Sequence, residues 1–402
     1  PRGNSICRMV DASEIAFLTT FLTSDKAWAI TGEVIGATGG ATFTANNSID
    51  LGNNTGWTIN SPSPRDLYWV GDGGNWTDQS HWATSSGGAG GVCVPNPSDN
   101  VYFDGNSFSS GGQIVTIDAT TANCRSMDWT GATNSPSLET TSSSNNLKIY
   151  GSLTLIPAMT FDFGGDIYFE ATTSGHTLTF ASHTVPVSWR YIFFNGAGGE
   201  WTMQDSLNAP GRYIELIAGT LTTNNQDITC RAINSANYNV RGLILGSSTI
   251  RLYNSGNSWY FPYPNNLTFN AGTSTIIYTY TLGNSGFYGG DQTYHKVVFL
   301  GGAEIKYNSN IFDTLVFSPG KTYILDNDET QTINNYLDAN GSCNSNIIIE
   351  SDAFPSDIYA VESQIKHHGY SVNDSLIKLT PRDGESAIRT EEHVAKLPFS
   401  IV

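Results

Sequence analysis

Short runs of alternating apolar and polar residues, separated by Gly, Asn and Ser, recur through the middle of this chain. Clear examples are LKIYGSLTL, YIELIAGTLTT and FDTLVFSPGKTYIL, at residues 147–155, 213–223 and 312–325. Period-two alternation with β-branched and aromatic residues predicts short strands. The intervening Gly and Asn supply the positive φ that tight turns need. We therefore expect many short strands here and no long helix.

The strand-like runs return at a spacing of roughly 20–25 residues, which is typical of repeat proteins. Rungs that stack on one another bury a continuous core that no single rung can bury. We predict an all-β fold: a right-handed parallel β-solenoid (β-helix) with short helical segments at its flanks. Tandem β-sandwiches are the alternative, because strands at 8–12-residue intervals also build that architecture.

The density of charged residues changes near both ends of the chain. Residues 42–349 hold 23 acidic and 11 basic residues, whereas the two flanks hold 13 and 8 in far fewer positions. A composition shift of this kind marks a boundary. We expect four segments: a separate piece at 1–41, a cap with the first rungs at 42–145, the solenoid proper at 146–349 and a separate piece at 350–402.

The formal net charge is −17 and the sequence pI is about 4.6. Nucleic-acid binding and docking on an anionic membrane both need an excess of Lys and Arg, so we expect neither. The sequence has no apolar run of about 18 residues, so we expect no spanning helix. The chain begins with Pro1. We expect its true N-terminus to lie upstream, so the lack of a visible signal peptide excludes nothing.

The chain has five Cys residues and no CxxC pair, which argues against a Cys-based zinc site. Cys93 and Cys124 flank one strand-rich unit and are disulfide candidates if the protein is extracellular. The alternative is that the thiols are free and buried, where Cys behaves as a small hydrophobic residue.

The most distinctive local motif is DLYWVGDGGNWTDQSHW, at residues 66–82. Its aromatic residues Tyr68, Trp69, Trp76 and Trp82 surround a Gly-rich turn. They are candidate ligand-binding residues, forming an aromatic platform for sugar rings. The alternative is a packed cap that closes the first rung, in which Trp supplies bulk and Gly allows the turn.

This motif and the following VPNPSDNVYFDGNSF (94–108) resemble a module of large repetitive secreted proteins of bacteria, in which a Trp/Gly-rich opening precedes a β-helical run. The resemblance extends over about three quarters of the chain. It implies an extracellular or cell-surface location and a structural or adhesive role, with glycans or other cell-surface components as partners.

Two carboxylate pairs are the weak candidates for chemistry on the solenoid. Asp162 and Asp166 flank an FGG turn, and polysaccharide cleavage needs two carboxylates close together. Asp326 and Asp328, with Glu329, form an acidic turn that could coordinate calcium through oxygen ligands. The simpler alternative for both sets is turn capping, because Asp readily bonds the backbone two residues ahead.

Residues 11–40 combine a helical pattern with a strand that ends in a Gly turn. Residues 8–40 resemble the C-terminal end of short-chain dehydrogenases/reductases, through the order ASEIAFLTTFLTSDKAWAITGEVIGATGG (12–40). That family's dinucleotide loop and its Tyr/Lys catalytic pair lie upstream of the part that the resemblance covers. The piece is therefore expected neither to bind the cofactor fully nor to transfer hydride.

Residues 350–402 resemble an internal fragment of kynureninase, most specifically through AFPSDIYAVESQIKHHGY (353–370). Residues 357–368 have a helical pattern that stops at Gly369. The resemblance implies pyridoxal-phosphate contacts at Phe354, which would stack on the ring, and at Ser356 and Asp357. The family's Schiff-base Lys lies downstream of the last residue given, and without it the cofactor chemistry cannot start.

Taken together, these features favour a non-enzymatic extracellular β-solenoid, with no cofactor expected. The alternatives are a pyridoxal-dependent hydrolase of kynurenine, if the C-terminal segment were complete, and a polysaccharide-cleaving β-helix. The three resemblances imply different compartments. Fusion of fragments in one reading frame is therefore a further hypothesis about the origin of the chain.

Overall fold

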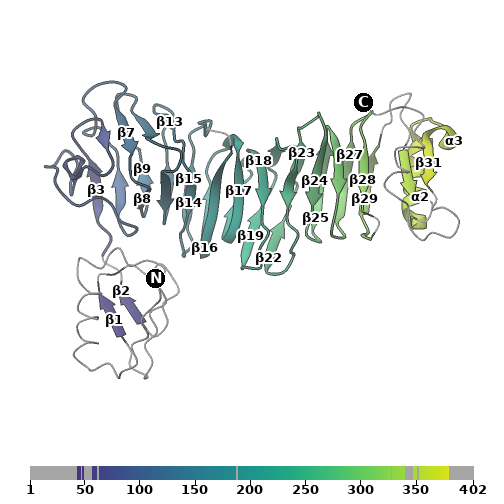
Figure 1. Ribbon diagram of the computed structural model, residues 1–402, viewed down its shortest axis with the longest axis horizontal. Helices are drawn as coiled ribbons and strands as arrows, with labels where there is room; N and C mark the ends of the chain where they lie inside the picture. Colours follow the sequence, from purple (N-terminus) through teal and green to yellow (C-terminus); the bar gives the residue numbers. More distant parts are fainter. Residues whose placement is uncertain are drawn as a thin grey trace, which may run out of the picture.

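The computed structural model describes residues 43–46, 48, 57–60, 63–186, 189–326, 328–339, 347–350 and 353–379. The piece predicted to resemble short-chain dehydrogenases lies outside these residues. The described chain is a parallel β-solenoid of about 11 turns, so the predicted fold is confirmed. Figure 1 shows its rungs stacked along one long axis, from β3 to β29.

Two hydrogen-bonded networks build the solenoid. The larger one has 23 strands among the described residues. In chain order they are β3 (Asp66–Trp69), β5 (Trp82–Ala83), β6 (Asn100–Tyr102), β8 (Thr121–Cys124), β9 (Met127–Asp128), β11 (Asn146–Ile149), β12 (Leu153–Thr154), β14 (Ile167–Phe169), β15 (His176–Thr179), β16 (Arg190–Met203), β17 (Leu207–Thr222), β18 (Ile228–Asn234), β19 (Arg241–Ile244), β20 (Thr249–Leu252), β21 (Asn257–Tyr260), β22 (Leu267–Asn270), β23 (Thr275–Tyr278), β24 (Asn284–Tyr288), β25 (Thr293–Phe299), β26 (Gly302–Ile305), β27 (Ile311–Phe317), β28 (Tyr323–Leu325) and β29 (Thr332–Asp338). The smaller network has four strands, in the order β13-β10-β7-β4. Their bounds are β4 (Gly74–Asn75), β7 (Ile114–Ile117), β10 (Ser137–Thr140) and β13 (Thr160–Asp162).

The remaining elements lie outside these two networks. They are β1 (Phe43–Asn46), β2 (Trp57–Asn60), the 3-10 helix η1 (Gln79–His81), β30 (Ile347–Glu350), α2 (Pro355–His367), α3 (Val372–Ser375) and β31 (Leu376–Leu379). Strands β1 and β2 pair with each other, as do β30 and β31. No helix of the described chain has the length and apolar character needed to cross a bilayer.

Rungs pair in parallel, and the register carries inward residues onto inward residues. Ile167 pairs with Ile192, Ile192 with Ile214 and Ile214 with Ile233. The same position continues through Trp259 and beyond. All of these side chains are almost fully buried. Because each buried aliphatic side chain contributes about 1.5–3 kcal/mol, this apolar column is the main source of the rod's stability.

The parallel pairing excludes the predicted alternative of tandem sandwiches, whose strands are antiparallel. Strands β3 and β5 form the one antiparallel pair within the two solenoid networks. Successive residues of the apolar column are separated by as few as 18 positions, from Phe287 to Ile305, and by as many as 28, from Trp259 to Phe287. This range includes the spacing of roughly 20–25 residues that the sequence predicts.

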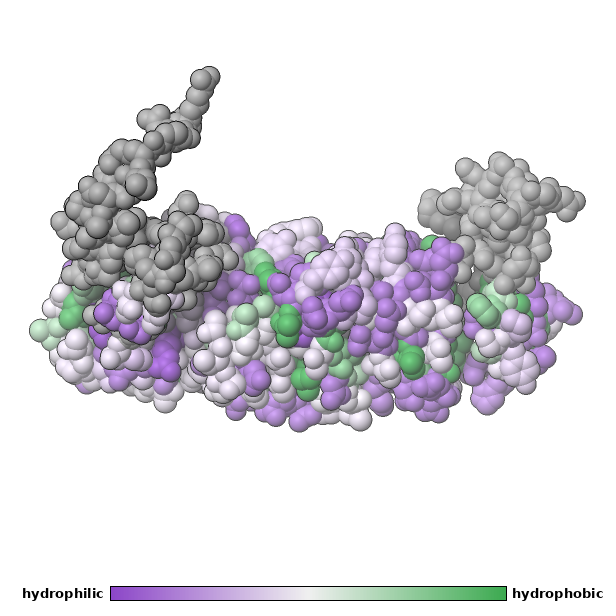
Figure 2. All heavy atoms as spheres, turned by 90° about the horizontal axis from the view of Figure 1, so that it is seen from below, coloured by the Kyte–Doolittle hydropathy of each residue, from purple (hydrophilic) through white to green (hydrophobic). Residues whose placement is uncertain are grey.

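Outward positions carry most of the polar residues, because side chains alternate between the two faces of a strand. The face drawn in Figure 2 is largely hydrophilic, and its hydrophobic residues are scattered over it. Unusual outward residues are therefore the ones that call for an explanation in terms of function.

Candidate functional site

The aromatic residues of the 66–82 motif pack mostly into the N-terminal end of the core. Trp69 and Trp82 are fully buried and Trp76 is 2% exposed. Trp69 Nε1 donates to the carbonyl of Asp72 at 2.6 Å, and Trp82 Nε1 donates to that of Trp76 at 2.9 Å. Tyr68 alone is half-exposed, on the outer face of β3. This geometry corresponds to the packed cap, because buried indoles cannot stack on a sugar.

The two predicted catalytic carboxylates lie in different sheets. Asp162 is an exposed residue at the end of β13, in the four-stranded network, where it pairs in register with Glu139. Asp166 precedes β14 in the large network, across the corner that the FGG turn makes. The FGG turn that was expected between them therefore forms a corner, which places the two carboxylates in different sheets.

The predicted calcium ligands hydrogen-bond with the preceding rung instead of converging on one point. Asp326 Oδ2 accepts from the backbone N–H of Tyr307 at 3.3 Å, and Glu329 Oε2 accepts from Ser309 Oγ at 2.7 Å. Asp328 is exposed. Among the described residues, no group of three or more His, Cys, Asp or Glu side chains is arranged to hold a metal ion.

Cys93 and Cys124 are both free thiols, so the predicted disulfide is not formed. The physical reason is that Cys124 points into the core from β8, whereas Cys93 lies exposed in a loop. Burial raises the pKa of the Cys124 thiol, and the pKa of the buried Cys230 thiol is raised for the same reason.

Thiol labelling should reflect this arrangement. In a protein whose Cys7 and Cys343 are replaced by Ser, we expect the exposed Cys93 alone to react with a maleimide under native conditions. Cys124 and Cys230 should react only after denaturation, because they are buried and their raised pKa leaves little thiolate. Mass spectrometry counts the labels. A protein with no reactive native thiol, and with only Cys230 reactive after unfolding, would instead contain the disulfide.

An unexpected group of aromatic side chains lies on the outer face of β14, β16 and β17 and in the turn that precedes β16. We call it the aromatic ladder: Tyr168, Trp189, Tyr191, Phe193 and Tyr213. The rings of Tyr168 and Phe193 stack with centroids 4.4 Å apart, and those of Tyr191 and Tyr213 stack at 5.2 Å. Tyr191 and Phe193, 5.3 Å apart, join the two stacks. The ladder therefore forms one continuous aromatic surface over three neighbouring rungs.

Trp189 stands at the edge of this ladder and is 64% exposed. Its backbone is in the left-handed region, with φ 67°, which is rare and strained for a bulky residue. The backbone N–H of Trp189 donates to the carbonyl of Gly211 at 2.9 Å, and the guanidinium of Arg231 lies 3.6 Å from its ring centroid. The surrounding structure thus holds an exposed indole in a conformation that it would not adopt by itself.

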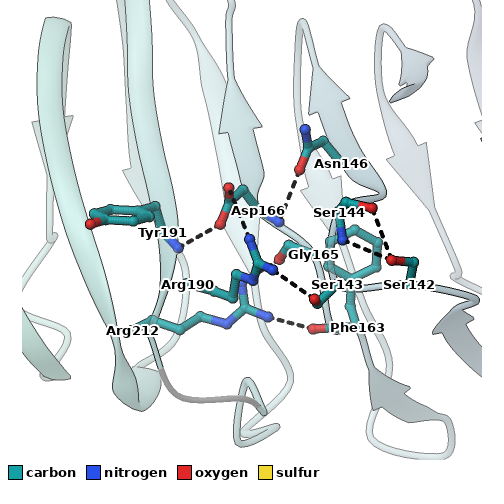
Figure 3. A network of polar contacts seen from close by, with 10 residues as sticks. All are labelled: Ser142, Ser143, Ser144, Asn146, Phe163, Gly165, Asp166, Arg190, Tyr191 and Arg212. Atoms are coloured by element: carbon teal, nitrogen blue, oxygen red, sulfur yellow. Dashed lines mark hydrogen bonds and ion pairs between the residues drawn. The ribbon is translucent and has the colours of Figure 1, made fainter. Parts of the chain in front are cut away.

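Ion pairs border the aromatic ladder. Lys148 lies 4.9 Å from the centroid of Tyr168, and its Nζ is 3.2 Å from the carboxylate of Glu170. Figure 3 shows Arg190 reaching both Asp166 and Ser143. Asp166 also accepts from the backbone N–H of Tyr191 at 2.9 Å. These contacts hold the polar rim of the ladder in place.

A buried arginine supports the corner beneath this rim. Arg212 is fully buried on β17, and it donates to the carbonyls of Gly165 at 2.7 Å and Phe163 (Figure 3). It also donates to the carbonyl of Pro186 at 2.9 Å. Burial lowers the pKa of Arg212 to about 10, so the guanidinium stays charged at neutral pH. Arg212 therefore connects three successive rungs at the position from which Trp189 and Arg190 project.

The register extends the row of outward residues along the rod. From Tyr168 and Phe193 it passes through Glu215 and Asn234 to Tyr260 and then to Tyr288. We call these six residues the outer row. Asn234 Nδ2 donates to Glu215 at 2.7 Å, and burial raises the pKa of the Glu215 carboxyl. The outer row thus has two aromatic residues at each end and a hydrogen-bonded amide–carboxyl pair between them.

A separate surface hollow of about 380 Å³ lies over β22, β25 and β27, and is lined by residues 269–272, 291–295 and Asp313. In it, His295 Nε2 is 3.8 Å from Asp313, and His295 Nδ1 lies 3.3 Å from the carbonyl of Ser274. The pair offers polar atoms to a ligand in the hollow. It lacks the continuous apolar surface that the aromatic ladder offers.

The residues implied as pyridoxal-phosphate contacts lie at the start of α2. Phe354 is 66% exposed, and Ser356 Oγ donates to Asp357 at 3.2 Å. A ring-stacking residue so open to water does not fit a bound cofactor, so no reaction step is assigned to it.

No family model matches the chain, and no solved structure does. A short segment is similar to kynureninases: 56% identical over 46 residues to that of Dictyostelium discoideum (11% of this chain, 10% of that protein) and 50% identical over 46 residues to that of Myxococcus xanthus (11% of each). The human kynureninase is 46% identical over 46 residues, again about a tenth of its length. The chain thus contains a kynureninase-like segment and spans about a tenth of the length of the curated relatives it matches.

Proposed function

We propose that this protein is an extracellular or cell-surface β-solenoid with a structural and adhesive role, and that its aromatic ladder binds glycan chains. Flat aromatic rings on a sheet remove the apolar faces of sugar rings from water, while neighbouring polar groups bond the hydroxyls. Binding sites on regular strands are held more rigidly than sites on loops. Four of the five ladder residues lie on strands, and Trp189 lies in the turn before β16, where its backbone N–H bonds the carbonyl of Gly211.

The observation that carries the proposal is the exposed, strained Trp189 beside a continuous aromatic surface. An exposed indole costs solubility, and its left-handed backbone costs about 1–3 kcal/mol. The structure maintains both at a site bordered by the ordered rim of Arg190 and Asp166. Such strain clusters at ligand sites in proteins generally, which supports a binding role here.

The outer row suits an extended polymer better than a single sugar. From Tyr168 to Tyr288 it crosses six rungs, a length of roughly 24 Å, because neighbouring strands lie about 4.8 Å apart. The proposed role is binding without cleavage. The two carboxylates that were candidates for cleavage, Asp162 and Asp166, lie in separate sheets.

We expect Trp189→Ala to weaken glycan binding by about 2 kcal/mol, or roughly 30-fold, because Trp is among the residues that most often carry the affinity of a binding surface. The substitution should not lower the free energy of unfolding, because the indole is largely exposed and its removal loses little packing. A glycan array identifies the ligands, and titration calorimetry then gives the affinity of both proteins.

Tyr336→Ala is the matched control. Tyr336 is 38% exposed and outward on β29, where it pairs with Thr314, away from the aromatic ladder. Its loss should leave glycan affinity unchanged. Equal glycan affinity of the wild type and Trp189→Ala, or no binding to any glycan on the array, would contradict the proposal.

A second candidate, a pyridoxal-dependent hydrolase of kynurenine, is favoured only by the short similarity to kynureninases. That similarity covers about a tenth of those enzymes, and the exposed Phe354 does not fit a cofactor pocket. We therefore assign the kynureninase-like segment no catalytic role.

A further inference from the structure

Arg231 is held beside the aromatic ladder in an unusual way. Its guanidinium lies 3.6 Å from the ring centroid of Trp189 and 5.4 Å from that of Tyr213. Arg231 Nε donates to Tyr213 Oη at 2.7 Å. Stacking on rings fixes the plane of a guanidinium but leaves its in-plane N–H donors available. Within the described chain, its two Nη groups have no hydrogen-bond acceptor.

Of the ten other basic side chains of the rod, five face a carboxylate within 4 Å: Arg65, Lys148, Arg190, Arg251 and Lys306. Arg125, Lys296 and Lys321 have no carboxylate within that distance in the described chain. Two more, Arg212 and Arg241, are buried and donate to backbone carbonyls. Arg231 differs, because aromatic rings and a phenol hold it in place while its charge has no carboxylate partner in the described chain.

We propose that Arg231 makes the aromatic ladder selective for glycans that carry anionic groups, with the guanidinium receiving a carboxylate or a sulfate while the sugar ring stacks on Trp189. This inference rests on the proposed glycan-binding function. Two parallel N–H donors on a fixed plane match the two oxygens of a carboxylate. The acidic charge of the whole chain does not prevent this, since charges farther away than about 8 Å are screened at physiological ionic strength.

The test compares three oligosaccharides of equal length by calorimetry: an oligogalacturonate, its carboxyl-reduced neutral counterpart and a sulfated oligosaccharide. We expect the wild type to bind at least one anionic sugar about tenfold or more tightly than the neutral one. Arg231→Gln should lose this preference while it keeps the neutral affinity. The preference should also shrink as salt is raised, because it depends on a partly exposed charge.

Arg251→Gln is the matched control, because Arg251 is exposed on the next rung but already paired with Asp227 at 3.0 Å. It should keep the preference. Arg231→Lys, which keeps the charge but not the planar fork, should retain part of it. Circular dichroism and the urea midpoint check that each variant is folded.

The outcomes separate the two proposals. If the wild type binds neutral and anionic sugars equally, the anionic selectivity is overturned while glycan binding stands. If Arg231→Gln weakens the binding of neutral and anionic sugars to the same extent, Arg231 only supports Trp189, and the proposed selectivity is again overturned. If the wild type binds none of the three and no glycan on an array, the proposed function itself fails.

Discussion

Replacing Arg212 with methionine is expected to lower the free energy of unfolding by on the order of 4 kcal/mol. The guanidinium donates to three backbone carbonyls from neighbouring rungs inside a fully buried corner. Methionine fills a similar volume but donates nothing, and each buried carbonyl left without a donor costs about 1–3 kcal/mol. Urea unfolding followed by tryptophan fluorescence measures the loss.

Two variants show whether the effect comes from the carbonyl bonds. Arg251→Met removes an exposed guanidinium that has one carboxylate partner, and should cost only about 0.5 kcal/mol. Arg212→Lys keeps a buried charge but not the planar fork of donors, so most of the stability should stay lost. If Arg212→Met unfolds at the same urea concentration as the wild type, the corner does not depend on this side chain.

Gly165→Ala is expected to destabilise the rod by about 3 kcal/mol or more. A Cβ added to Gly165 would lie 1.6 Å from the carbonyl oxygen of Asn145, on the preceding rung. Backbone atoms cannot move aside as a flexible side chain can, so neighbouring rungs must separate. The carbonyl of Gly165 also accepts from Arg212, and a shifted corner would weaken that bond as well.

Gly105→Ala provides the control for Gly165→Ala. A Cβ at Gly105 would have its nearest neighbour, the carbonyl oxygen of Gly131, at 3.8 Å, which is an ordinary contact. We expect its unfolding midpoint to stay within about 0.5 kcal/mol of the wild type. Equal stability of both alanine variants would mean that the rungs at Asn145 and Gly165 are farther apart than the structure has them.

The sequence alone predicts the solenoid well, because its signal is local and repeated. Alternation identifies inward residues such as Ile214 and Leu216 within one rung. The same alternation contains a clue to the buried arginines that sequence reasoning missed. Arg212 is in phase with Ile214 and Leu216, and Arg241 is in phase with Leu243. A charged residue at an inward position predicts a buried bonding role.

The aromatic ladder could not be predicted in the same way, because it depends on register between rungs. Tyr168 and Phe193 meet only since β14 and β16 align Ile167 with Ile192. The turns that set this alignment differ in length from one rung to the next. The 66–82 motif illustrates the opposite error. Its Trp residues attract attention in the sequence, yet the structure buries Trp69 and Trp82, and the exposed indole is the less conspicuous Trp189.

The Asp pair shows a further limit of local reasoning. Asp162 and Asp166 are four residues apart, but a corner between them places one in each sheet. The position of such a corner depends on how one rung closes upon the next, and composition does not specify it. For the kynureninase-like segment, in contrast, a contiguous motif is enough to identify the similarity from the sequence alone.

Hydrogen exchange with and without a bound oligosaccharide, read by mass spectrometry, tests most directly the claim that function lies on the outer face of the solenoid. We expect ligand-induced protection in peptides that cover 189–216 and 228–234, extending along the outer row to 167–169, 257–260 and 284–288 with a long oligosaccharide, and none in 353–379. Protection confined to the kynureninase-like segment, or absent from the rungs around Trp189, would contradict the account.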